Sequence, residues 1–163
     1  MLKITGMATE PSDGVVAEFA GQLFFRLWRA SHTRIAAALE SLGLTPALFG
    51  LLNLLGAREG ANQQELGSAM GIDPSTMVSL IDELERAGLA KRQPHPTDRR
   101  ARAVVLTAKG RRVRQRGRQV AGQVEDEVLG GLTAADRREL LRLLRLAYSS
   151  APPQPLWRAE EGD

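Results

Sequence analysis

Apolar residues recur along most of the chain at the three- and four-residue spacing of amphipathic helices, which predicts a mainly helical protein. A long first helix is expected over residues 13–41. Its apolar side comprises Val16, Phe19, Leu23, Leu27, Ala30, Ile35, Leu39 and Leu42. A second helix is expected to begin at Thr45 and Pro46, an N-cap followed by proline, and to end at Gly56. This second helix is apolar on nearly every side, so we expect it to be buried.

The stretch that follows predicts two short helices. Asn62 can cap the first of them, with Glu65 at its third position, and Gly71 can end it. Asp73 can cap the second, with Pro74 at its first position. A buried apolar stripe at helical spacing is expected on the second helix at Met77, Ile81, Leu84 and Ala87. Two helices joined by a glycine-containing turn are typical of a helix-turn-helix, although a plain corner between two helices has the same pattern.

A β-hairpin is expected next. Residues 90–93 and 102–106 are runs of strand length, and the second run contains two consecutive valines. The loop between them contains Asp98, a turn residue whose carboxylate can pair with a nearby arginine. Arg99 and Arg100 would project from this stiff tip, and an arginine held in this way can enter the minor groove of DNA. The alternative is a solvated hairpin with ordinary surface charges.

Two further helices are expected after the hairpin. Thr107 can cap the first, which should reach about Leu129, and Thr133 with Asp136 can open the second. The first carries a narrow apolar stripe at Val113, Gly117, Val120, Val124 and Val128. The second carries Leu140, Leu141, Leu143, Leu144, Leu146 and Ala147. One small core cannot cover apolar stripes at both ends of the chain, so we expect a two-fold dimer with interlocking terminal helices. The alternative is a monomer whose termini pack on its own core.

Several short motifs together suggest a family. They are Glu65-Leu66, Pro74-Ser75-Thr76, Leu80-Ile81-Asp82, Leu84-Glu85, Gly88-Leu89, Asp98-Arg99-Arg100, Leu106-Thr107 and Gly110. Through these residues the sequence resembles the MarR family of bacterial and archaeal transcriptional regulators, which are winged-helix dimers, over residues 19 to 148. The resemblance implies that Asp98 braces the wing and that Arg100 enters the minor groove. It also implies that Ser75 and Thr76 lie at the groove-facing start of the recognition helix.

The expected fold is therefore mainly α with a small β-hairpin wing (α+β). In this winged helix-turn-helix arrangement, the N- and C-terminal helices form a dimerisation region. Residues 45–106 would form the DNA-binding part, and residues 15–44 and 107–150 the dimerisation helices. Residues 1–14 and 151–163 would be a flexible lead and a flexible tail.

The charge distribution supports a polyanionic partner. The net charge is only +3, but 11 lysine and arginine residues lie between Lys91 and Arg118, where Asp98 is the only acidic residue. Such clustering is an electrostatic footprint for DNA. A solvated helix face could explain the arginines of residues 111–118, but it explains the basic wing less well.

Other classes of protein are disfavoured by what the sequence lacks. It contains no cysteine, which excludes disulfides, thiolate metal sites and a cysteine redox switch. It has neither a membrane-length apolar run nor a signal-peptide pattern, so a cytoplasmic protein is expected. His32 and His95 are the only histidines, and no phosphate-binding glycine loop or metalloprotease motif is present. We therefore expect no enzyme, no metal and no cofactor.

The expected function is that of a homodimeric transcriptional regulator, a repressor by family habit, whose two heads bind a pseudo-palindromic operator. The expected DNA contacts are Gln63, Gln64, Ser75, Thr76, Ser79, Lys91, Arg92, Arg99 and Arg100. Many relatives carry basic side chains along the recognition helix, whereas Arg86 is the only one here. Strong arginine-to-guanine readout by this helix is therefore not expected. The acidic patch Asp82, Glu83 and Glu85 favours a rival function, a winged-helix module that binds proteins and not DNA.

A small-molecule effector is also expected, because MarR-like regulators often bind small anionic or aromatic molecules between the dimerisation helices and the DNA-binding part. The candidate residues are Trp28, Arg29, His32 and Phe49. Phe49 could instead be an ordinary core residue, and Trp28 and His32 could be dimer-packing or surface residues.

Overall fold

The computed structural model describes residues 19–95 and 101–150. The helices are α1 (Ala20–Glu40), α2 (Pro46–Ala57), α3 (Gln63–Met70), α4 (Pro74–Arg86), α5 (Ala108–Val128) and α6 (Ala134–Ser150). The strands are β1 (Ala90–Pro94) and β2 (Arg102–Leu106), which pair antiparallel with Ala90 opposite Leu106. The predicted class, mainly helical with one β-hairpin, is confirmed.

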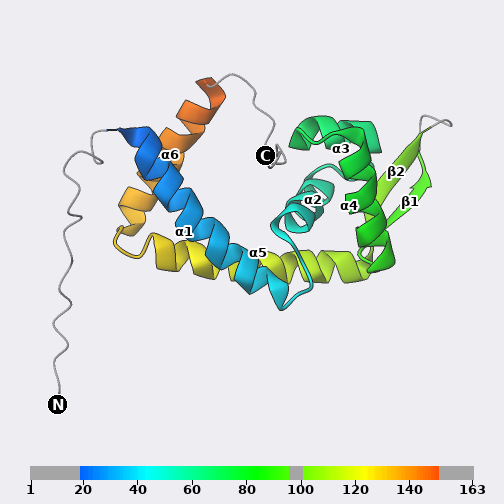
Figure 1. The fold of residues 1–163 in the computed structure, drawn as a ribbon, viewed down its shortest axis with the longest axis horizontal. Coiled ribbons are helices and arrows are strands. Elements are labelled where there is room, and N and C mark those ends of the chain that lie inside the picture. Colours follow the sequence, from blue (N-terminus) through cyan, green and yellow to red (C-terminus); the bar gives the residue numbers. More distant parts are fainter. Residues whose placement is uncertain (1–18, 96–100, 151–163) are drawn as a thin grey trace, which may run out of the picture.

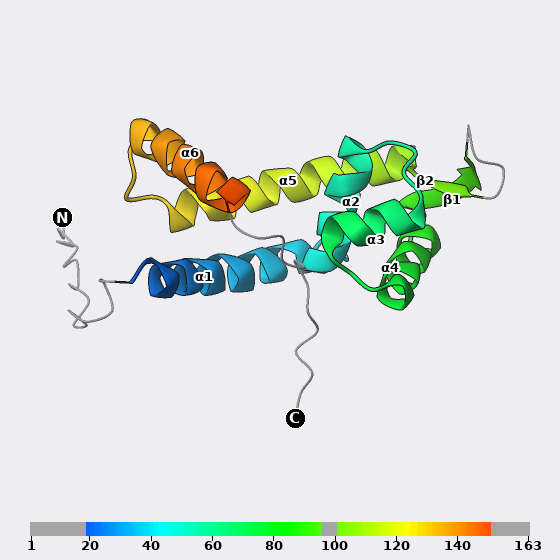
Figure 2. The ribbon, with the colours of Figure 1, turned by 90° about the horizontal axis from the view of Figure 1, so that it is seen from above.

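The long helix α5 connects two parts of the molecule (Figure 1). Helices α2, α3 and α4 and the hairpin gather at the N-terminal end of α5, and we call this part the head. Helix α1 lies beside α5, and α6 folds back at the far end of α5, away from the head (Figure 2). The head and the terminal helices are therefore joined mainly through α5 and the neighbouring helix α2.

The local signals in the sequence produce the helix ends that they predicted. Asn62 and Glu65 form a reciprocal capping box, in which the Glu65 N–H donates to Asn62 Oδ1 at 3.0 Å. Gly71 ends α3 with a left-handed φ of 63°. Asp73 caps α4 by accepting the Thr76 N–H at 2.9 Å. Asn62 and Glu65 thus fix the start of α3, and Gly71 and Asp73 fix the turn between α3 and α4, so the position of the second helix of the pair is set by local chemistry.

The core lies inside the head. Four leucines of α2 are buried, as the apolar composition of that helix predicted. They pack with buried side chains of α3, α4 and the hairpin, among them Leu66, Met77, Ile81, Leu84 and Val104. The terminal helices contribute far less to this core, since Leu39 is the only residue of α1 classed as buried and α6 has none.

Two details of the head differ from the sequence-based expectation. Helix α2 runs to Ala57, one residue past Gly56. A Cβ at Gly56 would lie 2.6 Å from Arg114 Nε of α5, so this glycine provides room for a neighbouring side chain and does not end the helix. Ala87 was expected in the buried stripe of α4, and this is wrong: it is the exposed C-cap of the helix. The chain reverses after it, and Leu89, only 4% exposed, enters the core in its place.

Candidate nucleic-acid interface and apolar pocket

The N-terminal end of α4 presents a short polar surface. Ser75, Thr76 and Ser79 are all exposed. The Ser75 hydroxyl donates to Asp73 Oδ1 at 2.5 Å, and the same oxygen accepts the Thr76 N–H. The hydrogen bond from Ser75 and then those from Thr76 hold the pKa of Asp73 well below its usual value. The capping carboxylate is therefore ionised near neutral pH, and it orients the two side chains that were expected to face DNA.

Helix α3 places its first residues beside this surface. Gln63 is half-buried and Gln64 is exposed. Both line a depression of about 640 Å³ together with Asp73 and Pro74 at the start of α4. Four of the five polar residues expected on the two helices thus lie in the first turns of α3 and α4, namely Gln63, Gln64, Ser75 and Thr76.

Arg92 of β1 is held by two carboxylates of α4. Its guanidinium donates to Asp82 Oδ1 at 2.6 Å and to the Glu85 carboxylate, and its backbone N–H donates to Glu85 Oε1 at 2.6 Å. Partial burial lowers the pKa of Arg92, but the hydrogen bonds to Asp82 and then Glu85 outweigh it and raise that pKa. The guanidinium that we expected to contact phosphate therefore already has partners within the head.

This cluster also gives a structural reason for the acidic residues of α4. Two of the three carboxylates in the expected acidic patch, Asp82 and Glu85, face the hairpin and neutralise Arg92. The sequence showed these residues as a separate acidic patch and a separate basic strand. Only the packing of β1 against α4 shows that they balance each other.

The remaining basic side chains lie along the hairpin and the adjoining half of α5. Lys91 is exposed on β1. Exposed side chains of the same sign follow at Arg102, Lys109, Arg111, Arg112, Arg116 and Arg118. The expected wing residues Asp98, Arg99 and Arg100 lie outside the described residues. The exposed basic residues of the hairpin and of the first half of α5 therefore lie at the end of the molecule that carries the head, where Figure 1 places these elements.

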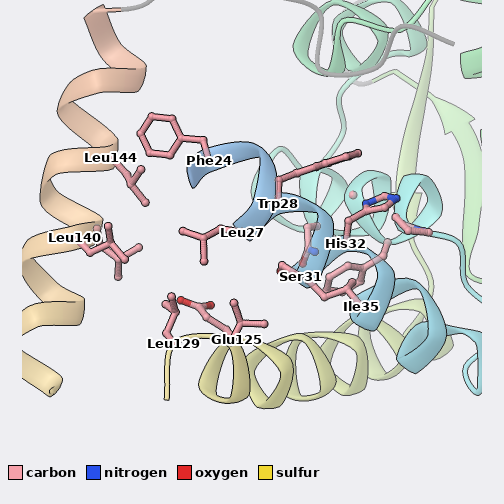
Figure 3. Close-up of a pocket in the computed structure, with 16 residues that line it drawn as sticks. Phe24, Leu27, Trp28, Ser31, His32, Ile35, Glu125, Leu129, Leu140 and Leu144 are labelled. Carbon is pink, nitrogen blue, oxygen red and sulfur yellow. The ribbon is translucent and has the colours of Figure 1, made fainter. Parts of the chain in front are cut away.

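An apolar pocket of about 570 Å³ lies where α1, α2, α5 and α6 meet. Trp28 and His32 of α1 line it with stacked rings, whose centroids are 4.9 Å apart. Phe49 of α2 also lines it, whereas Arg29 is not among the lining residues. Three of the four effector candidates are therefore brought together. Figure 3 shows α1 crossing the pocket between α6 and α5, with Glu125 on the α5 side.

Sequence reasoning missed several residues of this pocket, including Ser31, Asn53, Glu125 and the leucines of α6. Glu125 is the first of three adjacent acids on α5, and consecutive side chains on a helix point in different directions. Its neighbour Asp126 pairs with Arg137 at the start of α6. No local signal distinguishes Glu125 from its neighbours, because its place in the pocket depends on how α1 and α6 pack around α5.

Helix α2 lies between the pocket and the rest of the head. Phe49 packs so closely on α5 that a Cβ at Gly117 would lie 2.6 Å from its ring. On the same helix, Asn53 accepts a hydrogen bond from Arg114 Nε at 3.3 Å. Gly50 lines the pocket and also lies against α3, since a Cβ added at Gly50 would be 3.4 Å from Met70 Cε. A change in the shape of the pocket would therefore act on the helix-turn-helix through the packing contacts of α2.

Neither a metal site nor a membrane span was found in the part of the chain that the structure describes. No group of three or more histidine, aspartate or glutamate side chains there could hold a metal ion. No described helix combines the length and apolar character needed to cross a bilayer.

Comparison with known proteins identifies the fold. Residues 42–101 match the model of the MarR family. The chain is 30% identical over 155 residues to a protein of Thauera aromatica assigned to transcriptional regulation of the hcr operon, and the match covers 90% of this chain and 93% of that protein. It is 32% identical over 124 residues to the HTH-type transcriptional repressor Rv2887 of Mycobacterium tuberculosis, and this match covers 76% and 89% of the two chains.

Among solved structures, the repressor CouR bound to a 23-mer DNA duplex matches with a TM-score of 0.74 and 31% identity, over 86% of this chain and 99% of CouR. CouR from Rhodococcus jostii RHA1 bound to p-coumaroyl-CoA matches with a TM-score of 0.73 and 27% identity, again over 86% and 99%. These relatives are transcriptional regulators and not enzymes, which confirms the expectation that this protein is not an enzyme. The chain belongs to the MarR family of DNA-binding, winged-helix transcriptional regulators.

Proposed function

We propose that this regulator is a homodimeric repressor that binds a pseudo-palindromic operator and is released by a small molecule. The observation that carries the proposal is the exposed polar start of α4, fixed by the Asp73 cap beside a basic hairpin. In the helix-turn-helix arrangement, the N-terminal residues of the second helix contact base edges in the major groove. Two related heads at a fixed spacing would address two half-sites.

The contacts with DNA would divide by type. Ser75, Thr76 and Ser79 would contact the edges of bases or nearby phosphates in the major groove. Gln63, Gln64, Lys91 and Arg99 would contact phosphates, and Arg100, braced by Asp98, would enter the minor groove. For Arg92 we now favour an indirect role alongside the expected phosphate contact, because its two carboxylate partners tie the hairpin to the recognition helix. The solved DNA complex of CouR supports this type of binding.

Dimerisation would cover the apolar side chains that the single chain leaves exposed. On α1, Phe25 is 58% exposed and Trp28 is 56% exposed. On α6, Leu146 is 57% exposed and Tyr148 is 74% exposed. Contiguous exposed apolar surface of this kind marks an interaction site. A two-fold axis that places α1 and α6 of one protomer against those of its partner would bury both surfaces together.

The effector would bind in the pocket lined by Trp28, His32 and Phe49. A volume of about 570 Å³ lies within the range of sites for small organic ligands. Because α2 contacts both the pocket and α3, a ligand that fits one position of α2 better than another would change the spacing of the two heads. The solved complex of CouR with p-coumaroyl-CoA supports the existence of effectors among its relatives.

The test is selection of binding sites from random duplexes, followed by titration of the selected site at several salt concentrations. We expect a palindromic site, a mass in solution of two chains, and a steep loss of affinity with salt. Arg100→Ala should weaken binding about 10- to 100-fold, the effect of losing one charge-assisted contact. Arg138→Ala, on the exposed surface of α6, is the matched control and should not weaken it.

Two results would count against the proposal. A protein that binds duplexes weakly, without sequence preference or salt dependence, would favour the protein-interaction module. A selected site that Arg100→Ala and the wild type bind equally well would reject the role of the wing while leaving that of α4 intact.

A further inference from the structure

A row of positive charge runs along one side of α5, outside the DNA contacts proposed for the head. Lys109, Arg112 and Arg116 follow one another at spacings of three and four residues, so they share one side of the helix. Together with Gln115 and Gln119 they line a depression of about 420 Å³. We call these residues the α5 basic face. We propose that it binds the phosphate backbone of a second DNA segment while the head holds the operator.

The α5 basic face lies on the opposite side of the head from the expected operator contacts. Lys109 Nζ donates to the carbonyl oxygen of Ala87, the C-cap of α4, at 2.8 Å. Ser75 and Thr76 lie at the other end of α4, which is about 20 Å long at 1.5 Å per residue. Figure 1 shows α5 along one side of the head and α3 along the opposite side. A duplex held against the starts of α3 and α4 therefore leaves the α5 basic face exposed.

The charges of this face are not used within the fold. Arg112 and Arg116 are exposed, and neither forms a hydrogen bond or an ion pair with another residue that the structure describes. The Lys109 ammonium has three donors, so its bond to Ala87 leaves it able to contact a phosphate as well. Basic residues at the start of α5 and acidic residues at its end both oppose the helix dipole. Helix stability therefore does not explain the row, and a partner does.

The length and composition of the face fit a phosphate backbone. Its three cations extend over about 10 Å of helix axis, and one strand of a duplex presents a phosphate about every 3.4 Å. The face can therefore meet about three phosphates, with guanidinium and amide groups as hydrogen-bond donors. Among the described residues that line the depression, Val113 is the only apolar one, and it is half-buried. Membrane-binding helices and the cores of protein interfaces use exposed apolar or aromatic side chains, so DNA is the better fit.

The experiment separates the α5 basic face from the head. The full-length protein is first saturated with an equivalent of the selected operator duplex, so that the heads are occupied. A fluorescently labelled duplex of unrelated sequence is then added, and its binding is measured by anisotropy at about 50–200 mM salt. With three phosphate contacts, the wild type should lose about 40-fold in affinity for the labelled duplex across this range. Arg112→Gln/Arg116→Gln, with one contact left, should bind it more weakly at low salt and lose only about 4-fold.

The matched control is Arg138→Gln/Arg145→Gln, which removes the same charge from exposed positions on α6. This variant should bind the labelled duplex as the wild type does. Glutamine and arginine have similar helix propensities, so both double variants should keep the urea midpoint of the wild type. The affinity for labelled operator alone should be equal in the two double variants, because neither changes a residue at the starts of α3 and α4.

The possible failures are distinguishable. If the operator-saturated wild type binds no labelled duplex at low salt, or if the two double variants bind it equally well, the inference is wrong while operator binding by the head stands. If phosphatidylglycerol vesicles or a polyglutamate peptide compete more tightly than unlabelled duplex, the face has a different partner and the inference is also overturned. If no operator can be selected, the proposed function fails. The labelled duplex is then titrated with protein alone, where a difference between the double variants still tests the face.

Discussion

The contact between α5 and the end of α4 provides the sharpest test of the fold. Gly110, in the first turn of α5, is buried against the backbone of Leu89. A Cβ added at Gly110 would lie 2.8 Å from the carbonyl carbon of Leu89 and nearer still to its oxygen. Thr107 is fixed to the same junction, because its N–H donates to Leu89 O at 3.0 Å and its hydroxyl to Gly88 O at 2.7 Å. We therefore expect Gly110→Ala to push α5 away from the segment that joins α4 to β1.

The magnitude follows from opposing contributions to the free energy of unfolding. Replacing glycine with alanine inside a helix normally stabilises a protein by about 1 kcal/mol. Overpacking of a buried site costs about 1–3 kcal/mol, and here the neighbour is backbone, which cannot turn aside as a side chain can. Moving the junction would also weaken the Thr107 hydrogen bonds, each of which contributes about 1 kcal/mol. We expect a net loss of about 2–3 kcal/mol.

The measurement is urea denaturation of Gly110→Ala beside Gly122→Ala. Gly122 lies in the same helix, and a Cβ there would meet nothing within 4 Å. Gly122→Ala should therefore be as stable as the wild type or up to about 1 kcal/mol more stable. If both alanine variants are equally stable, the close approach of α5 to Leu89 does not exist in solution, and the reasoning fails. Weaker duplex binding by the folded fraction of Gly110→Ala would show that the same junction positions the hairpin.

Two further predictions concern the head. Arg92→Gln removes the guanidinium that pairs with two carboxylates of α4. We expect the free energy of unfolding, measured by urea denaturation, to fall by about 1–2 kcal/mol, and by less in high salt. An unchanged midpoint would show that the ion pairs do not form in solution. Asp73→Ala removes the cap of α4 and should lower the urea midpoint of unfolding at pH 7. Because folding lowers the pKa of Asp73, its contribution is complete above its unfolded pKa of about 4 and is lost as the pH falls further. The stability gap between wild type and Asp73→Ala should therefore narrow in acid denaturation below about pH 4, and a gap that widened there would contradict the sign.

Much of the head could be predicted from the sequence because its determinants are local. The capping box of Asn62 and Glu65, the Asp73 cap followed by Pro74, and the left-handed Gly71 each act within four residues. The segment from Thr107 to Gly110 is a partial exception. Thr107 was expected as a cap and is one, but its contact with the end of α4 could not be deduced without the fold.

The distribution of apolar residues around each helix predicted which helices are buried within a single chain. Helix α2, apolar on nearly every side, lies inside the head, whereas α1 and α6 keep large exposed apolar side chains. The sequence thus indicated that a single chain could not cover its terminal helices. It could not supply the geometry of the surface that would cover them, because that depends on how two helical ends meet.

The sequence by itself determined where most of the elements begin and end, although α1 begins at Ala20 and not at the expected residue 13, with Phe19 extended as its N-cap. It also determined the order of helices and hairpin and the location of positive charge along the chain. Those properties depend on neighbours in sequence, on periodicity and on composition. The tertiary structure alone decided that Arg92 pairs with two carboxylates of α4, and that Trp28, Phe49 and Glu125 share one pocket. These residues lie 7 to 97 positions apart in the chain, and only the packing of α1, α2, α5 and β1 brings their side chains within reach of each other.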